Sequence, residues 1–245
     1  GFERTHIETE ATKLAYDARN RLVSDPRVFD ATSKMTSDQL AVDLANKISM
    51  NRVIDDVSAI AEEVHKDTIY ITVVDKDRMS VSLIYSIFHG FGSGIASEKF
   101  GVLFQNRGAG FNLVPGHFNE YGPNKRPMHT IIPAIVKEKG LIKMPFGVMG
   151  GQYQATGHAR ILSNIYDFGM EIQTALDAPR SFFENGSLRI ERGYSERTVQ
   201  KLSSLGHSID QEIGPIGGAQ AIKINENGVL EGASDPRKDG SAIGY

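Results

Sequence analysis

Residues 67–75 read Asp67-Thr68-Ile69-Tyr70-Ile71-Thr72-Val73-Val74-Asp75 and carry the clearest strand signal in this chain. Its β-branched and aromatic residues are typical of a strand, and a second run of the same kind covers residues 81–88. The charged turn Asp75-Lys76-Asp77-Arg78 separates the two runs. Together they predict a β-hairpin that begins at a threonine.

Thr68 stands at the head of the first strand. Most threonines in strands have no chemical role, because a β-branched side chain simply fits a pleated sheet. Thr68 becomes a nucleophile, however, if the peptide bond before it is cut. The freed α-amine, with a reference pKa of about 7.7–8.0, is then a suitable base for the neighbouring hydroxyl. This second interpretation needs support from the rest of the chain.

Length and composition restrict the classes of protein. The chain has 245 residues, 40% hydrophobic and 23% charged, which suits one large domain or two small ones. Its net charge of −3 is not gathered into long blocks, which argues against nucleic acid or an anionic membrane surface as a partner. No apolar run approaches the ~20 residues of a membrane span, and residues 1–6 resemble no export signal.

The residue inventory argues against metals and cofactors. Cysteine is absent, which excludes disulfides, thiolate metal sites and cysteine nucleophiles, and leaves the cellular compartment open. The seven histidines show no metal-ligand spacing, and there is no phosphate loop or dinucleotide fingerprint. We therefore expect neither a metal ion nor an organic cofactor.

Apolar periodicity and turn signals predict the other elements. Helices are expected over 7–22, from Ser37 onward with Leu40, Leu44 and Ile48 buried, over 155–168, over 171–178, and from Ser195. Strands are expected over 101–105, 131–136, 142–148 and 219–224, the last followed by an Asn227-Gly228 hairpin turn. This order favours an α+β fold over a doubly wound one. The long loop 108–127 is typical of a functional segment.

Two local features allow a catalytic as well as a structural interpretation. Gly150-Gly151 follows the apolar strand that ends at Met149, and a doublet of this kind is most often a turn. The same two backbone N–H groups can also form an oxyanion hole. Arg107 is either a surface charge or a guanidinium that binds a substrate carboxylate.

Several motifs resemble those of the γ-glutamyltransferases, also called γ-glutamyltranspeptidases, which are N-terminal-nucleophile hydrolases. The resemblance covers nearly the whole chain in family order. The matching segments are Glu8 to Pro26, Thr68 to Asp77, Phe91-Gly92-Ser93-Gly94-Ile95, Gly122 to Pro127, Met149-Gly150-Gly151, Ala178-Pro179-Arg180 and Gly232 to Arg237.

The resemblance implies a four-layer αββα sandwich and a precursor that cuts itself between Asp67 and Thr68. Residues 1–67 would then end the large subunit, and residues 68–245 would form the small, catalytic subunit. Family precursors extend much further at the N-terminus, so the remainder of the large subunit is an expected partner. A homodimer of processed heterodimers is compatible with the family, and any targeting signal would lie upstream.

Family roles can be carried over residue by residue. Thr68 is implied as nucleophile and, through its own amine, as base. Ser86 stands where the family has a threonine whose hydroxyl contacts the nucleophile. Gly150 and Gly151 match the pair whose N–H groups stabilise the oxyanion.

The substrate pocket departs from the transpeptidase pattern. Phe88 replaces an asparagine, Arg107 a glutamine, and Gly110 the aspartate that pairs with the substrate α-ammonium. His129 and Thr130 replace two serines that hold its α-carboxylate. The segment 106–111 instead resembles a branch that includes cephalosporin-acylase relatives.

Three hypotheses remain at this point. The first is a self-processing enzyme that hydrolyses or transfers γ-glutamyl amides such as glutathione. The second keeps the mechanism but takes a glutaryl-like or other carboxylated amide, because Gly110 removes the partner of an α-ammonium. The third is a non-catalytic member of the family or an inert fragment.

Overall fold

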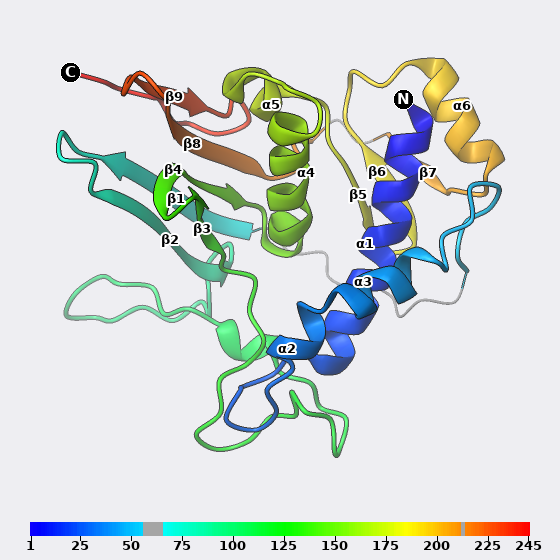
Figure 1. Ribbon diagram of the computed structural model, residues 1–245. Helices are drawn as coiled ribbons and strands as arrows, with labels where there is room; N and C mark the ends of the chain where they lie inside the picture. Colours follow the sequence, from blue (N-terminus) through cyan, green and yellow to red (C-terminus); the bar gives the residue numbers. More distant parts are fainter. Residues whose placement is uncertain (56–65, 212–213) are drawn as a thin grey trace. The chain divides into compact units, whose positions relative to one another are not determined.

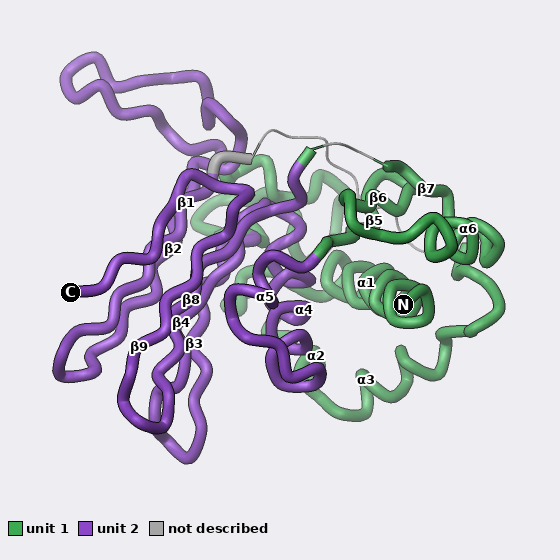
Figure 2. Tube along the Cα trace, turned by 90° about the horizontal axis from the view of Figure 1, so that it is seen from above, with its two compact units in different colours: residues 1–63, 107–129, 179–214 green, residues 64–106, 130–178, 215–245 purple. Residues whose placement is uncertain are grey.

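The computed structural model describes residues 1–55, 66–211 and 214–245, and the side chains of 66 and 67 fall outside that description. The chain forms two compact units, shown in green and purple in Figure 2. Unit 1 contains residues 1–63, 107–129 and 179–214, and unit 2 contains residues 64–106, 130–178 and 215–245. The predicted division between residues 67 and 68 concerns the cleavage of one peptide bond. The division into compact units therefore does not test it.

An antiparallel four-stranded sheet forms the centre of unit 2 (Figure 1). Its strands are ordered β3 (Pro133–Glu138), β4 (Leu141–Met149), β8 (Gly218–Ile224) and β9 (Leu230–Ser234). The predicted strands over 131–136, 142–148 and 219–224 are confirmed, with small shifts at their ends. The loop 226–228 joins β8 to β9 between the hydrogen-bonded residues Asn225 and Val229, so it is one residue longer than the predicted two-residue turn, and Gly228 has a positive φ of 83°.

The predicted hairpin is also confirmed. Strand β1 (Lys66–Val74) pairs antiparallel with β2 (Ser80–His89) as a separate two-stranded sheet. The turn between them is closed by the Asp75 side chain, which accepts hydrogen bonds from the N–H groups of Asp77 and Met79. This short charged turn therefore helps to set the strand register in which Thr68 lies opposite Ser86.

Strand β4 is covered on both faces, because successive side chains point to opposite sides. Phe146 lies 5.1 Å from the ring of His158 in α4 (Gln154–Tyr166). The neighbouring Gly147 faces the hairpin, and a Cβ at this position would lie 2.2 Å from the ring of Tyr70. A glycine is needed there so that β1 can approach. Unit 2 therefore has the layer order helix, sheet, hairpin, and α5 (Ile172–Asp177) adds to its helical layer.

Unit 1 has a smaller sheet and more helix. It contains α1 (Phe2–Leu22), α2 (Thr32–Met35), α3 (Asp38–Ala45), the 3₁₀ turn η1 (Arg107–Gly110) and α6 (Glu196–Ser204). Its three strands are β5 (Ser181–Glu184), β6 (Ser187–Ile190) and β7 (Ile209–Asp210). Leu188, Ile190 and Leu202 form its apolar core. Ser37 caps α3 through its side chain, as predicted, and Ser195, where the last helix was expected to begin, caps α6 in the same way.

Two sequence predictions were wrong, and three short strands were not predicted. Residues 101–105 are not a strand, since Leu103 makes only an isolated bridge with Ala96. Leu40, Leu44 and Ile48 are half-buried rather than buried. The strands β5 to β7 were not predicted, because runs of two to four residues carry too little alternation to be recognised. The polar and acidic segment 51–67, whose composition suits a short helix or a tether, lies largely outside the described residues.

Candidate active site

The predicted nucleophile and its hydroxyl neighbour meet in unit 2. Thr68 and Ser86 are directly opposite each other in β1 and β2, and both are half-buried. The Thr68 Oγ1 hydroxyl donates a hydrogen bond to Ser86 Oγ at 3.1 Å. The contact that the family resemblance implied for Ser86 is therefore present.

A β-bulge lies opposite the predicted scissile bond. The register of the hairpin shifts between Asp67 and Thr68, where Asp67 pairs with Phe88 but Thr68 pairs with Ser86. Phe88 has a φ of 76°, which is rare for an aromatic residue, and its N–H donates to Ser86 Oγ at 3.0 Å. Ser86 Oγ thus accepts one hydrogen bond from each of the two strands at the bulge. Bulges are frequent beside active sites because they redirect a side chain.

Phe88 itself is buried, with 6% of its surface exposed, and its ring lies 4.7 Å from that of His89. The His89 N–H donates to Asn106 Oδ1, and the Asn106 N–H donates to the carbonyl of Ile87. The end of β2 is therefore tied to Asn106, the residue that directly precedes Arg107 in the chain.

Gly150 and Gly151 join β4 to the short helix η2 (Gly151–Tyr153), which leads into α4. Both have positive φ, 126° and 56°. A Cβ on Gly150 would lie 2.7 Å from the Cα of Gly217, so the doublet has a structural reason as well as its proposed role. Gly151 is the first residue of η2, where no preceding helical carbonyl accepts its N–H.

Three of the predicted substrate-pocket positions lie together in unit 1. Arg107 opens η1 and is half-buried, and Gly110 closes it. A Cβ on Gly110 would lie 2.5 Å from the carbonyl oxygen of Met128, so this backbone leaves no space for an aspartate. His129 follows Met128. Thr130 is buried and belongs to unit 2.

Electrostatics link Arg107 to His129. Burial lowers the pKa of Arg107, although an arginine remains charged at any physiological pH. Partial burial, and then the positive charges of Arg107 and Arg126, lower the pKa of His129 below its usual value. The pair therefore carries one fixed positive charge beside a neutral imidazole near pH 7, an arrangement that favours a carboxylate ligand.

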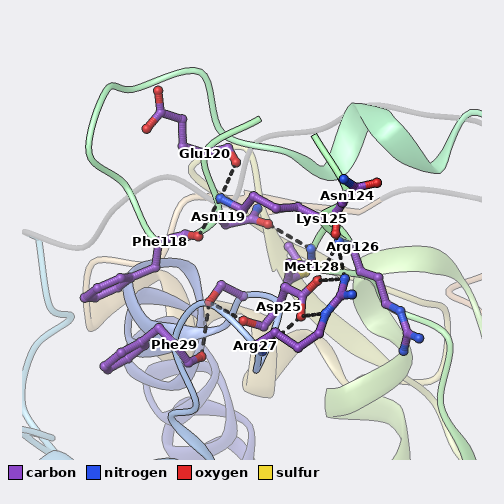
Figure 3. A network of polar contacts seen from close by, with 11 residues as sticks. Asp25, Arg27, Phe29, Phe118, Asn119, Glu120, Asn124, Lys125, Arg126 and Met128 are labelled. Atoms are coloured by element: carbon purple, nitrogen blue, oxygen red, sulfur yellow. Dashed lines mark hydrogen bonds and ion pairs between the residues drawn. The ribbon is translucent and has the colours of Figure 1, made fainter. Parts of the chain in front are cut away.

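A polar network that the sequence analysis missed holds the loop 108–127. Asn119 is 5% exposed and joins Gly110 to Met128, and Lys125 Nζ donates to the carbonyls of Phe118 and Glu120 on either side of it (Figure 3). The signal in the sequence was an asparagine in a glycine- and proline-rich loop, which is too common to single out.

The same loop is fixed to the segment that follows α1. Asp25 accepts from the Arg126 N–H and pairs with Arg27, which lowers the Asp25 pKa well below its usual value. The rings of Phe29 and Phe118 stack 3.9 Å apart. Figure 3 shows these contacts converging on the loop from one side.

One buried cluster has the residue types of a metal site. Ligand atoms of His6, Glu10 and His207 lie within 4.8 Å of one another in unit 1. His6 Nδ1 is hydrogen-bonded to His207 Nε2 at 2.7 Å, and Glu10 pairs with the buried Lys13 at 2.8 Å. The Lys13 ammonium thus already supplies the positive charge that a cation would bring. Residues 201 positions apart give no spacing signal in the sequence.

Comparison with known proteins assigns the family. The γ-glutamyltranspeptidase family model matches residues 2–245. The chain belongs to this family. It is 35% identical over 252 residues to the glutathione hydrolase-like YwrD proenzyme of Bacillus subtilis, and the match covers 99% of this chain and 47% of that protein.

Two further relatives belong to the acylase and amidohydrolase types. The chain is 34% identical to the oxamate amidohydrolase proenzyme of Klebsiella pneumoniae, covering 99% of this chain and 47% of the relative. The crystal structure of a cephalosporin acylase from Bacillus halodurans superposes with a TM-score of 0.88 at 34% identity, covering all of this chain and 46% of the acylase. The α+β fold of the N-terminal-nucleophile type is thereby confirmed.

The chain spans about half the length of the curated relatives it matches. These relatives are proenzymes by name. None of the helices in the described part of the chain is long and apolar enough to cross a membrane.

Proposed function

We propose that this chain is the C-terminal part of a self-processing amidohydrolase or acyltransferase whose nucleophile is Thr68. The observation that carries the proposal is the hydrogen bond from Thr68 Oγ1 to Ser86 Oγ beside the bulge at the 67/68 bond, within a γ-glutamyltranspeptidase family member. The proenzyme names of its relatives support self-cleavage. The partner would be the remainder of the same precursor.

Self-cleavage would begin with attack of Thr68 Oγ1 on the carbonyl carbon of Asp67. The C–N bond breaks as the ester forms, and the departing nitrogen takes up the proton that the Thr68 hydroxyl gives up and becomes the α-amine of Thr68. Water then hydrolyses the ester, which leaves a carboxylate on Asp67 and a free hydroxyl on Thr68. Ser86 would orient the hydroxyl for the first step.

Turnover would repeat the same chemistry on an amide substrate. The free α-amine accepts the proton of the Thr68 hydroxyl as Oγ1 attacks the amide carbonyl, and returns it to the leaving amine. The N–H groups of Gly150 and Gly151 would stabilise the oxyanion. Loss of one such donor typically raises the activation free energy by about 2.7–4 kcal/mol. Water or an acceptor amine then takes the acyl group from Thr68, giving hydrolysis or transfer.

The substrate would be an amide whose acyl group carries a carboxylate. The γ-glutamyl amides, including glutathione, are the first candidates because of the family and the glutathione hydrolase-like relative. A glutaryl-like amide is the second, because the Met128 carbonyl fills the space beside Gly110 where the partner of an α-ammonium would stand. Arg107 and His129 would bind the carboxylate in both cases.

Two measurements test the proposal. N-terminal sequencing and mass spectrometry of the purified protein should reveal a fragment that starts Thr68-Ile69-Tyr70, and the Thr68→Ala protein should stay intact. A protein that remains whole on long incubation and hydrolyses no amide would refute self-processing and leave the non-catalytic alternative. Turnover of γ-glutamyl-anilide against glutaryl-anilide then separates the two substrate classes.

A further inference from the structure

Asn119 uses its whole side-chain amide to join two parts of unit 1 that carry the candidate carboxylate ligands. Its Nδ2 donates to the Gly110 carbonyl at 2.7 Å, and its Oδ1 accepts from the Met128 N–H at 2.9 Å. With 5% of its surface exposed, Asn119 makes these bonds away from bulk water. A buried amide bonded at both ends fixes the distance between two backbone segments.

The backbone of Asn119 is fixed as well. Its N–H donates to His117 Nδ1 at 3.0 Å, and its carbonyl accepts from the Asn112 N–H at 2.8 Å. Lys125 Nζ holds the carbonyls of the two flanking residues (Figure 3). The side chain therefore projects from a braced position rather than from a free loop.

Each joined segment ends at a candidate ligand of the substrate. Gly110 is the last residue of the turn that Arg107 opens, and Met128 directly precedes His129. The two segments approach so closely that only a glycine fits opposite the Met128 carbonyl. A change in the Gly110–Met128 spacing would therefore move the Arg107 guanidinium relative to His129.

We propose that Asn119 is a positioning residue that determines specificity for carboxylated acyl groups, by holding the Arg107 turn against the segment that carries His129. The inference rests on the part of the proposed function that assigns Arg107 to a carboxylate. Asparagine is required because the bridge needs one donor and one acceptor in the same planar group. Aspartate keeps the acceptor but would set a carboxylate against the Gly110 carbonyl.

The experiment measures binding of glutarate by calorimetry to the whole 245-residue chain carrying Thr68→Ala, so that the result does not depend on cleavage. Asn119→Asp and Asn119→Leu should each weaken glutarate binding about tenfold or more, because both lose the donor to Gly110. The matched control is Asn112→Asp in the same loop. Asn112 Oδ1 only accepts from the Val114 N–H, so aspartate can replace it with little effect.

If Asn119 acts by positioning Arg107, its effect on glutarate binding should largely disappear when Arg107 is replaced, whereas a purely structural effect should persist. In an Arg107→Met background, glutarate binding should already be weak, and Asn119→Asp should reduce it by less than about twofold, because both changes act on the same contact. Thermal unfolding of each variant shows whether the fold is lost. Asn119→Leu introduces no charge, so a loss of binding seen only in Asn119→Asp would be due to its negative charge.

Three results would overturn the proposal: glutarate binding unchanged in both Asn119 variants, equal losses in Asn119→Asp and Asn112→Asp, or no glutarate binding by the parent protein. Failure of the proposed function is a separate result, since it is measured as absence of cleavage at 67/68 in the protein that retains Thr68. Butyryl-anilide turnover by the processed protein adds a further check. Asn119→Asp should lower glutaryl-anilide turnover without lowering turnover of this uncharged analogue.

Discussion

The nucleophile end of the hairpin and the loop 107–129 are built in different ways. Thr68 and Ser86 are placed by the register of two paired strands, with the hairpin packed on β4. Arg107 and His129 are placed by a loop with only one 3₁₀ turn, which side-chain bonds from Asn119, Lys125 and Asp25 hold to the backbone. Strand pairing therefore places the proposed catalytic residues, and individual polar side chains place the residues proposed to bind a carboxylate.

This difference has a consequence for variation within the family. A hairpin register depends on many backbone bonds at once, so a single substitution rarely changes it. A loop held by a few side chains can be reshaped by one or two substitutions, and substrate recognition commonly resides on such loops. The departures from the transpeptidase pattern at Arg107, Gly110 and His129 all lie in that loop.

The largest effect is expected at the nucleophile. Thr68→Ala should abolish both self-cleavage and turnover, because no other group supplies the hydroxyl and the α-amine from one residue. Gel electrophoresis of the incubated protein and an amide-hydrolysis assay measure the two losses. Thr68→Ser, which keeps the hydroxyl, should retain slow cleavage. A cleaved Thr68→Ala protein would assign the reaction to another residue.

Ser86→Ala tests whether the hairpin register serves the chemistry. Removing the acceptor of the Thr68 hydroxyl should slow self-cleavage by about 10²-fold, a typical value for a group that assists proton transfer. The matched control is Ser82→Ala in the same strand. Ser82 bonds Tyr70 and the Ala134 N–H, so its loss should reduce the free energy of unfolding by about 1–3 kcal/mol with cleavage retained. Equal cleavage rates in the two variants would contradict the assignment.

Unit 1, which contains the loop 107–129, should be destabilised at acidic pH because of His207. Burial, and then the charges of Lys13 and His6, lower its pKa to about 4 in the folded chain, whereas an unfolded histidine titrates near 6.5. The unfolded state therefore binds more protons between these values. The free energy of unfolding should fall by roughly 2 kcal/mol as the pH drops from 6.5 to 5.

Urea unfolding at several pH values measures this slope. His207→Gln cannot titrate and should flatten it. If the slope survives in His207→Gln, the acid sensitivity arises elsewhere.

The smallest expected effect concerns His129. Because its pKa is lowered, His129 is neutral at pH 8 and gains charge only on acidification. Binding of glutarate should therefore tighten by about twofold between pH 8 and pH 6, as a second positive charge appears beside Arg107. Calorimetry on the Thr68→Ala protein measures the change. His129→Gln should remove it, and an opposite slope would exclude His129 from the carboxylate site.

Local sequence patterns predicted most of the regular elements. The hairpin at Thr68, the hairpin that turns at Gly228, and the starts of α3 and α6 at Ser37 and Ser195 follow from short-range propensity, which depends on residues close together in the chain. The run 101–105 was misjudged because an apolar segment becomes a strand only where another strand pairs with it. The strands β5 to β7 were missed because their pairing, including the parallel β6–β7 contact, joins distant residues.

The sequence by itself determined the family, the nucleophile hypothesis and the residues that depart from the transpeptidase pattern, because motifs and their order are written along the chain. Only the tertiary structure decided that Thr68 bonds Ser86 across a bulge, that Gly110 faces a carbonyl, and that Asn119 joins Gly110 to Met128. The physical reason is that hydrogen bonds and close approaches depend on distance in space. The folded backbone sets that distance between residues that no local pattern connects.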